Sequence, residues 1–183
     1  IVDTGLFGEH TQGHWRGIFE NYLDGKPVTR VIATHLHNDH TGNAGWICQE
    51  WGCELWMSRS DFYMCKVMAA DGPSDVPNDA ILFYRRAGFD EARLDRYRNR
   101  FGQFGANIAP LPAGYRRITD GQYINIGDRE WRAIIGHGHA PEHVCLYCPE
   151  LKLIIGGDQL LPRITPNVSV QPSEPFANPL KDW

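Results

Sequence analysis

Four residues that commonly bind metal ions lie within six positions of the segment THLHNDHTG: His35, His37, Asp39 and His40. Neutral imidazole binds zinc or iron, and a carboxylate adds negative charge and a harder oxygen donor. In an extended turn, His35 and His37 point to the same side of the chain and can chelate one metal ion. Asp39 and His40 follow where the chain bends towards a helix, so they can face a second ion. The spacing therefore predicts a metal site for one or two ions.

A second group of candidate ligands lies nearer the C-terminal end. These residues are His137, His139 and His143 in the segment IIGHGHAPEHVCLY, and Asp158 in LIIGGDQLLPR. In both segments the candidate ligands follow apolar runs typical of strands, as the first cluster does. Spacing alone leaves His137 and His139 as alternative ligands. Six of the eight histidines thus lie in two short stretches that could close a metal site together.

The first cluster has a simpler alternative, a polar loop of solvated histidines that caps a helix. The apolar segment VTRVIA precedes the histidines, and it favours a metal site because α/β folds place their sites at strand ends. The other two histidines, His10 and His14, lie near a predicted helix start and are expected on the surface.

Short strands and helices are predicted around both clusters. VTRVIATHLH predicts a buried strand that ends at the histidines, and GNAGWICQEWG predicts a helix that ends at Gly52. CELWMS predicts a second strand. From residue 120 onward the pattern indicates a ladder of strands with a hairpin turn at Gly127 and Asp128. The strands of this ladder are GQYINI, REWRAIIG, HVCLYCP and KLIIGGD.

The segment 58–117 differs from its surroundings in charge. It contains ten Lys or Arg and seven Asp or Glu residues, whereas the rest of the chain contains eight and fifteen. It is predicted to form helices between breaks rich in proline and glycine. Strands that alternate with helices, followed by a run of strands, favour an α/β layered fold. We therefore expect a single domain over 1–183, with a helical insertion or lid at 58–117.

The overall composition excludes several classes of protein. It is 42% hydrophobic and 22% charged, without an apolar run near the roughly 18 residues of a membrane span and without a signal-peptide pattern. Five cysteines, an odd number, favour a reduced, cytoplasmic protein over a disulfide scaffold. The net charge of −4 argues against nucleic acid as a general partner. We expect a small-molecule substrate and no membrane contact.

The motifs HLHNDHTGN, GHAPEHVCLY and GGD, in this order, resemble those of the metallo-β-lactamase superfamily, whose first metal motif is H-x-H-x-D-H. The opening IVDTG is similar to the family's early strand and turn. The resemblance covers nearly the whole chain, with 58–117 the least constrained part. It implies an αββα sandwich with a two-metal site at one edge.

The resemblance also implies a role for each candidate ligand. By this resemblance, the first metal ion is bound by His35, His37 and His139. The second ion is bound by Asp39 and His40, and Asp158 bridges both ions. It implies two zinc ions per chain, although iron and manganese accept the same donors. Asp39 is in addition the residue to which we assign a catalytic role.

Two further residues receive less specific expectations. His143 is expected to contact the substrate or to support a ligand, with a plain strand-edge histidine as the alternative. Asp3 in VDTG is expected to hold a turn beneath the site.

Two features depart from the family pattern. The second metal usually takes another histidine from a later strand, and no histidine follows His143. The family fold also has strands before the VDTG strand and further elements after the bridging aspartate. The chain therefore looks truncated at both ends, and open sheet edges would make a homo-oligomer possible.

The chemistry that the resemblance implies is hydrolysis by a hydroxide shared between two metals, since metal binding lowers the pKa of water towards ~7. Asp158 favours the glyoxalase II, lactonase and nuclease branches over true β-lactamases. We therefore expect hydrolysis of a thioester, ester or lactone. The basic insertion could receive an anionic thioester, or could be an ordinary solvated helix face. The alternative functions are a mononuclear iron persulfide dioxygenase, a metal-dependent ribonuclease and a non-catalytic metal-binding fragment.

Overall fold

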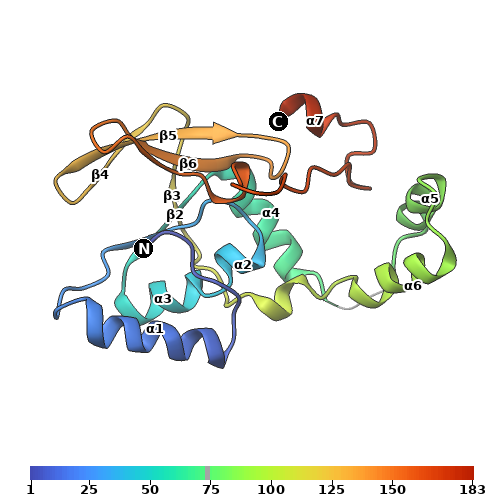
Figure 1. The fold of residues 1–183 in the computed structure, drawn as a ribbon. Helices are drawn as coiled ribbons and strands as arrows, with labels where there is room; N and C mark the ends of the chain where they lie inside the picture. Colours follow the sequence, from blue (N-terminus) through green and yellow to red (C-terminus); the bar gives the residue numbers. More distant parts are fainter. Residues whose placement is uncertain (73–74) are drawn as a thin grey trace.

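One layer of helices and two sheets make up the body of the protein. The computed structural model describes residues 1–72 and 75–183. Helices α1 (Glu9–Tyr22), α3 (Ala44–Trp51) and α4 (Arg59–Ala70) lie on one side of a first sheet, and a second sheet lies on its other side (Figure 1). This mixed α/β architecture confirms the predicted fold class.

The first sheet is short and parallel. Its strands β1 (Arg30–Ile32), β2 (Glu54–Met57) and β3 (Arg116–Arg117) pair in that order. Val2 forms a parallel bridge to Ile32, so the first residues of the chain extend this sheet. β1 and β2 lie where the sequence predicted strands, whereas β3 ends a segment that was predicted to be helical.

The second sheet is an antiparallel meander. Strands β4 (Tyr123–Ile126), β5 (Arg129–Gly136), β6 (His143–Cys148) and β7 (Leu153–Ile155) pair in sequence order. The β4–β5 hairpin turns at Gly127, whose φ of 64° suits glycine. All four strands and this turn confirm the predicted ladder.

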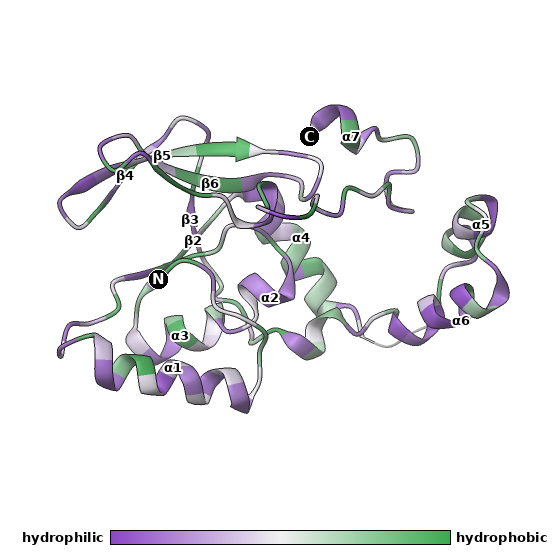
Figure 2. Cartoon of the chain, viewed as in Figure 1, coloured by the Kyte–Doolittle hydropathy of each residue, from purple (hydrophilic) through white to green (hydrophobic). Residues whose placement is uncertain are grey.

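Apolar side chains from both sheets fill the space between them. Ile32 and Trp56 of the first sheet belong to the same cluster as Trp131, Val144 and Leu146 of the second. Alternate residues of β5 are buried, because a strand turns successive side chains to opposite faces. Figure 2 shows the resulting hydrophobic colour along β5 and β6.

A second cluster joins the first sheet to its helices. Ile47 of α3 and Phe62 of α4 are almost fully buried there against residues such as Leu55. α3 ends as predicted at Gly52, whose φ of 60° is the left-handed conformation that often terminates helices.

The segment 58–117 is not uniform. α4 packs into the body, whereas α5 (Asn78–Arg86) and α6 (Glu91–Arg100) project away from it (Figure 1). These two helices bury Ile81 and Leu94, and the rings of Tyr84 and Tyr97 lie 4.6 Å apart. Residues 73–74 of the predicted insertion lie outside the described residues.

The remaining elements are short: α2 (Asn38–Thr41), η1 (Phe104–Asn107), η2 (Gly157–Gln159) and α7 (Pro179–Asp182). Two of them, α2 and η2, carry candidate ligands. α7 lies beside the loop after β5, where a Cβ on Gly138 would meet Pro179 O.

No helix in the described part of the chain has both the length and the apolar character that crossing a membrane requires.

Candidate metal centre

The candidate ligands converge where loops leave the two sheets. A hydrogen bond of 2.7 Å from Val144 N to Thr34 O ties the sheets together at this edge. By element, the candidate ligands are His35 and His37 after β1, Asp39 and His40 in α2, His139 between β5 and β6, and Asp158 in η2.

Three imidazole nitrogens form the first potential ligand group. His35 Nε2 lies 2.9 Å from His37 Nδ1, which lies 3.1 Å from His139 Nε2. The third side of this triangle, from His139 Nε2 to His35 Nε2, is 3.2 Å. Ligand atoms around a tetrahedral zinc ion with Zn–N bonds of about 2.0 Å lie about 3.3 Å apart. The spacing of the three nitrogens therefore suits one small cation.

Hydrogen bonds on the outer side of two of these rings determine which nitrogen faces the group. Thr34 Oγ1 donates to Asp3 Oδ2 at 2.9 Å, so it accepts from His35 Nδ1 at 3.0 Å. His139 Nδ1 donates to Asn167 O at 2.8 Å. In both rings the proton is therefore on Nδ1, and the lone pair of Nε2 faces the other ligands. Metal-binding histidines are typically oriented in this way.

The second potential group consists of His35, His40 and Asp158. His40 Nε2 lies 3.4 Å from Asp158 Oδ1 and 3.7 Å from Asp39 Oδ2. The other oxygen of Asp158, Oδ2, lies 3.6 Å from His139 Nε2. Asp158 therefore presents one carboxylate oxygen to each half of the cluster.

Asp3 orients His40 directly. Its Oδ2 accepts from His40 Nδ1 at 2.8 Å, and its Oδ1 accepts from Thr34 N at 2.8 Å. Burial alone would lower the pKa of His40. The hydrogen bond to Asp3 and the charges of Asp3, Asp39 and Asp158 outweigh burial and raise that pKa above its usual value. The turn residue expected from the sequence thus also contacts a candidate ligand.

Two histidines of the first group, His35 and His37, are held as neutral rings. Burial, followed by the charges of neighbouring histidines, lowers the pKa of His35 far below its usual value. Burial, with His139 next in importance, also lowers the pKa of His37. Neutral imidazole is the form that binds cations, and imidazole with carboxylate suits zinc, iron or manganese. The residues present therefore fit a metal ion.

Asp61, which the sequence did not single out, joins two loops of the site. It lies fully buried in the first turn of α4. Its Oδ1 accepts from Leu36 N at 2.8 Å, and its Oδ2 accepts from Glu142 N at 2.7 Å. Ser58 Oγ donates to the same carboxylate at 3.2 Å.

The position of Asp61 makes it a support for both halves of the first ligand group. Leu36 lies between His35 and His37, and Glu142 lies in the loop that carries His139. Burial raises the pKa of Asp61 to about 6, although its hydrogen bonds act in the opposite direction. Its only signal in the sequence is Ser-x-x-Asp before a helix, which is common to many helix starts.

The other two histidines of the second stretch have different environments. His143 is fully buried, and its Nε2 accepts a hydrogen bond from Asp158 N at 3.1 Å. Burial lowers the pKa of His143 to about 4. His137 is exposed, and its Nδ1 donates to Pro141 O at 2.6 Å. The structure therefore brings His139, and not His137, to the cluster, and places His143 against the backbone of Asp158.

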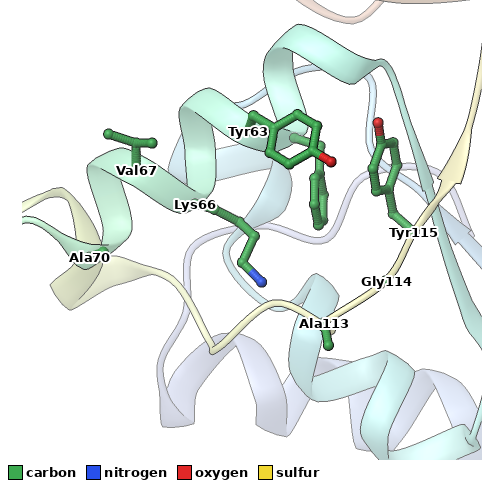
Figure 3. Close-up of a pocket in the computed structure, with 8 residues that line it drawn as sticks. Tyr63, Lys66, Val67, Ala70, Ala113, Gly114 and Tyr115 are labelled. Carbon is green, nitrogen blue, oxygen red and sulfur yellow. The ribbon is translucent and has the colours of Figure 1, made fainter.

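A separate pocket of about 530 Å³ lies along α4 (Figure 3). Tyr63 and Lys66 of α4 line it together with Tyr115 from the segment before β3. No candidate ligand lines this pocket, so it is distinct from the metal centre.

Comparison with known proteins identifies relatives over nearly the whole chain. The model of the metallo-beta-lactamase superfamily matches residues 1–182. The chain shares 36% sequence identity with a beta-lactamase domain protein from Burkholderia ambifaria, whose crystal structure superposes with a TM-score of 0.84. The match covers 99% of this chain and 52% of that protein. A metallo-beta-lactamase family protein from Thermus thermophilus shares 24% sequence identity, and its structure superposes with a TM-score of 0.75. This match covers 99% of this chain and 57% of that protein.

An uncharacterized protein of Aquifex aeolicus is 28% identical over 160 residues, which are 87% of this chain and 58% of that protein. The chain thus spans about half the length of the proteins it matches.

The two facing sheets and the histidine cluster at their edge define a fold of metal-dependent hydrolases with a site able to bind metal. The chain belongs to the metallo-beta-lactamase superfamily.

Proposed function

We propose that the protein is a hydrolase of a thioester, ester or lactone that uses two metal ions, most simply zinc. The observation that carries the proposal is the placement of Asp158. Its two oxygens lie 3.4 Å from His40 Nε2 and 3.6 Å from His139 Nε2. A carboxylate that faces both ligand groups suits a bridge between two ions, with His35 and His37 on one side and Asp39 on the other.

When bound, a pair of metal ions supplies a nucleophile at neutral pH by lowering the pKa of water, and polarises the oxygen under attack. The chain's own residues hold the ligands for this chemistry. Asp3 keeps a proton on Nδ1 of His40, and Asn167 O keeps one on Nδ1 of His139. The side chain of Asp39 is 60% exposed and lies 3.7 Å from His40 Nε2, so its carboxylate faces both solvent and the second ligand group.

The proposal extends to the substrate and the compartment. An anionic small molecule, such as a thioester of the kind hydrolysed by glyoxalase II, would suit the exposed arginines of α6: Arg93, Arg96, Arg98 and Arg100. The five cysteines, all among the described residues, are free thiols, which suits the cytoplasm.

Metal content and turnover together test the proposal. The protein is purified without added metal, its metals are counted by elemental mass spectrometry, and it is assayed on thioesters, esters and lactones. We expect about two zinc ions per chain and saturable hydrolysis. His37→Ala should lower both the zinc content and the rate. His137→Ala is the matched control, because His137 is an exposed histidine outside both ligand groups, and it should change neither.

Each other outcome contradicts the proposal in a different way. A single iron with oxidation of a persulfide would replace hydrolysis by the oxygenase alternative. Cleavage of RNA without cleavage of esters would replace it by the ribonuclease. Full metal loading without any turnover would indicate a non-catalytic metal-binding protein.

A further inference from the structure

Two histidines outside the metal centre lie side by side on α1. His10 and His14 are four residues apart, and both are exposed. Their Nε2 atoms lie 3.2 Å from each other. The ring centroids are 4.6 Å apart with the ring planes at 86°. The two ring nitrogens therefore face each other beside the helix, at a separation that two ligands of one ion can have.

This spacing follows from the helix itself. Residues at positions i and i+4 lie on the same face, one turn apart. Ligand nitrogens around a tetrahedral zinc ion are about 3.3 Å apart, close to the separation found here. A pair of neutral imidazoles can share only one hydrogen bond, whereas a cation can accept a lone pair from each ring. The helix thus preorganises two ligands without any contribution from the rest of the chain.

The surroundings leave room for an ion and its water molecules. Gly13 and Gly17 are on the same helix, and a Cβ added to either would meet no atom within 4 Å. α1 lies on the outer side of the helical layer, away from the second sheet (Figure 1). Neither His10 nor His14 belongs to the ligand groups of the metal centre. Occupancy of the pair would therefore be independent of that centre.

We propose that His10 and His14 form a surface site for a divalent transition-metal cation such as Ni²⁺ or Cu²⁺, with water completing the coordination. Imidazole selects these ions over Mg²⁺ and Ca²⁺, which require oxygen ligands. The ion would link the first two turns of α1. The N-cap residue of that helix, Gly8, provides no side-chain cap, so a bound ion would stabilise the start of the helix.

Titration of the zinc-loaded protein with Ni²⁺ tests this site. Isothermal calorimetry should show one nickel ion bound per chain, while mass spectrometry shows the zinc content unchanged. His10→Ala and His14→Ala should each weaken nickel binding by at least about tenfold, because a chelate exceeds the affinity of a single ligand. His137→Ala, which removes an exposed histidine far from this pair in the chain, should leave the affinity unchanged. Ni²⁺ should raise the melting temperature of the wild type and of His137→Ala only.

Three results would overturn the inference. Equal nickel affinity in the wild type and His14→Ala would show that the pair does not chelate. Loss of one zinc for each nickel bound would place the nickel in the metal centre. Equal weakening by His137→Ala would indicate general adsorption to histidines. None of these readouts depends on hydrolysis, so the outcome is separable from that of the proposed function.

Discussion

Asp3 combines an uncommon backbone conformation with three hydrogen bonds to its carboxylate. Its φ of 55° is left-handed, which costs a non-glycine residue on the order of 1 kcal/mol. In that conformation the carboxylate accepts from Thr34 N, Thr34 Oγ1 and His40 Nδ1. The position thus links the strand end, the first ligand group through Thr34, and the second through His40.

Asp3→Asn is expected to weaken binding of the second metal ion. Asparagine adopts the same backbone conformation but loses one acceptor oxygen and the negative charge opposite His40. Changes in such supporting residues typically weaken metal affinity by about 10- to 100-fold. Competition with a chromophoric chelator measures this affinity. Asp24→Asn is the matched control, since Asp24 has a φ of 49° and is exposed; an equal effect of this control would contradict the role of Asp3.

The raised pKa of Asp61 makes stability depend on pH. The folded pKa is about 6, compared with an ordinary value of 3.8. Between these values the folded protein holds more protons than the unfolded chain. The contribution to stability is therefore fully present below the ordinary value and is lost as the pH rises through about 6. At 1.36 kcal/mol per pKa unit, the loss is up to about 3 kcal/mol.

Asp61→Asn isolates this effect, because the amide does not titrate. Urea unfolding of both proteins at about pH 4.5 and about pH 7 gives the difference in free energy of unfolding. The wild type should lose stability relative to the variant at the higher pH. Asp71→Asn, at an exposed position just after the same helix, should show the pH dependence of the wild type. A pH-independent difference between the wild type and Asp61→Asn would contradict the assignment.

At the scale of residues, the candidate ligands and the supporting Asp3 could be found from the sequence, whereas the supporting role of Asp61 could not. His35, His37, Asp39 and His40 are of the right types at close spacing, so their chemistry is visible in the sequence. The role of Asp61 depends on Leu36 N and Glu142 N, which come close only in the folded chain.

At the scale of elements, α3 illustrates how closely the helical layer packs. Gly45 is buried, and a Cβ there would meet backbone atoms of Ala109 and Pro110. Gly45→Ala should therefore destabilise the protein by about 2 kcal/mol or more. Gly17→Ala, in α1, should instead stabilise it by about 0.5–1 kcal/mol, because alanine favours helix and has open space there. Urea unfolding measures both, and a similar effect of the two substitutions would contradict this packing.

The elements that could be predicted are those whose own residues carry the pattern. The β4–β5 hairpin was found from two strand-like runs and a Gly-Asp turn, and α3 from its sequence pattern and Gly52. β3 is two exposed arginines paired with β2, so its pairing depends on a distant strand. The sequence also did not predict that α5 and α6 project away from the body, because their apolar residues are equally suited to packing these helices on the body.

At the scale of the whole molecule, the metal centre connects the two sheets. His35 and His37 follow the first sheet, whereas His139 and Asp158 come from loops of the second. An ion bound to both should stabilise the folded state alone. Removing metal with a chelator should lower the free energy of unfolding by at least about 3 kcal/mol, the value for metal at about 100 times its Kd.

Thermal unfolding with and without the chelator measures this difference. His37→Ala should show a much smaller chelator effect, because its first ligand group is incomplete. An equal decrease in both proteins would indicate that the chelator acts elsewhere.

His35 is shared by both potential ligand groups, yet its Nε2 has a single lone pair to give. An ion bound by His35, His37 and His139 therefore deprives the other position of one donor. The second ion then depends on His40, Asp158 and Asp39. Loading should proceed in two unequal steps, so that at limiting zinc the population contains chains with one ion before any chain has two.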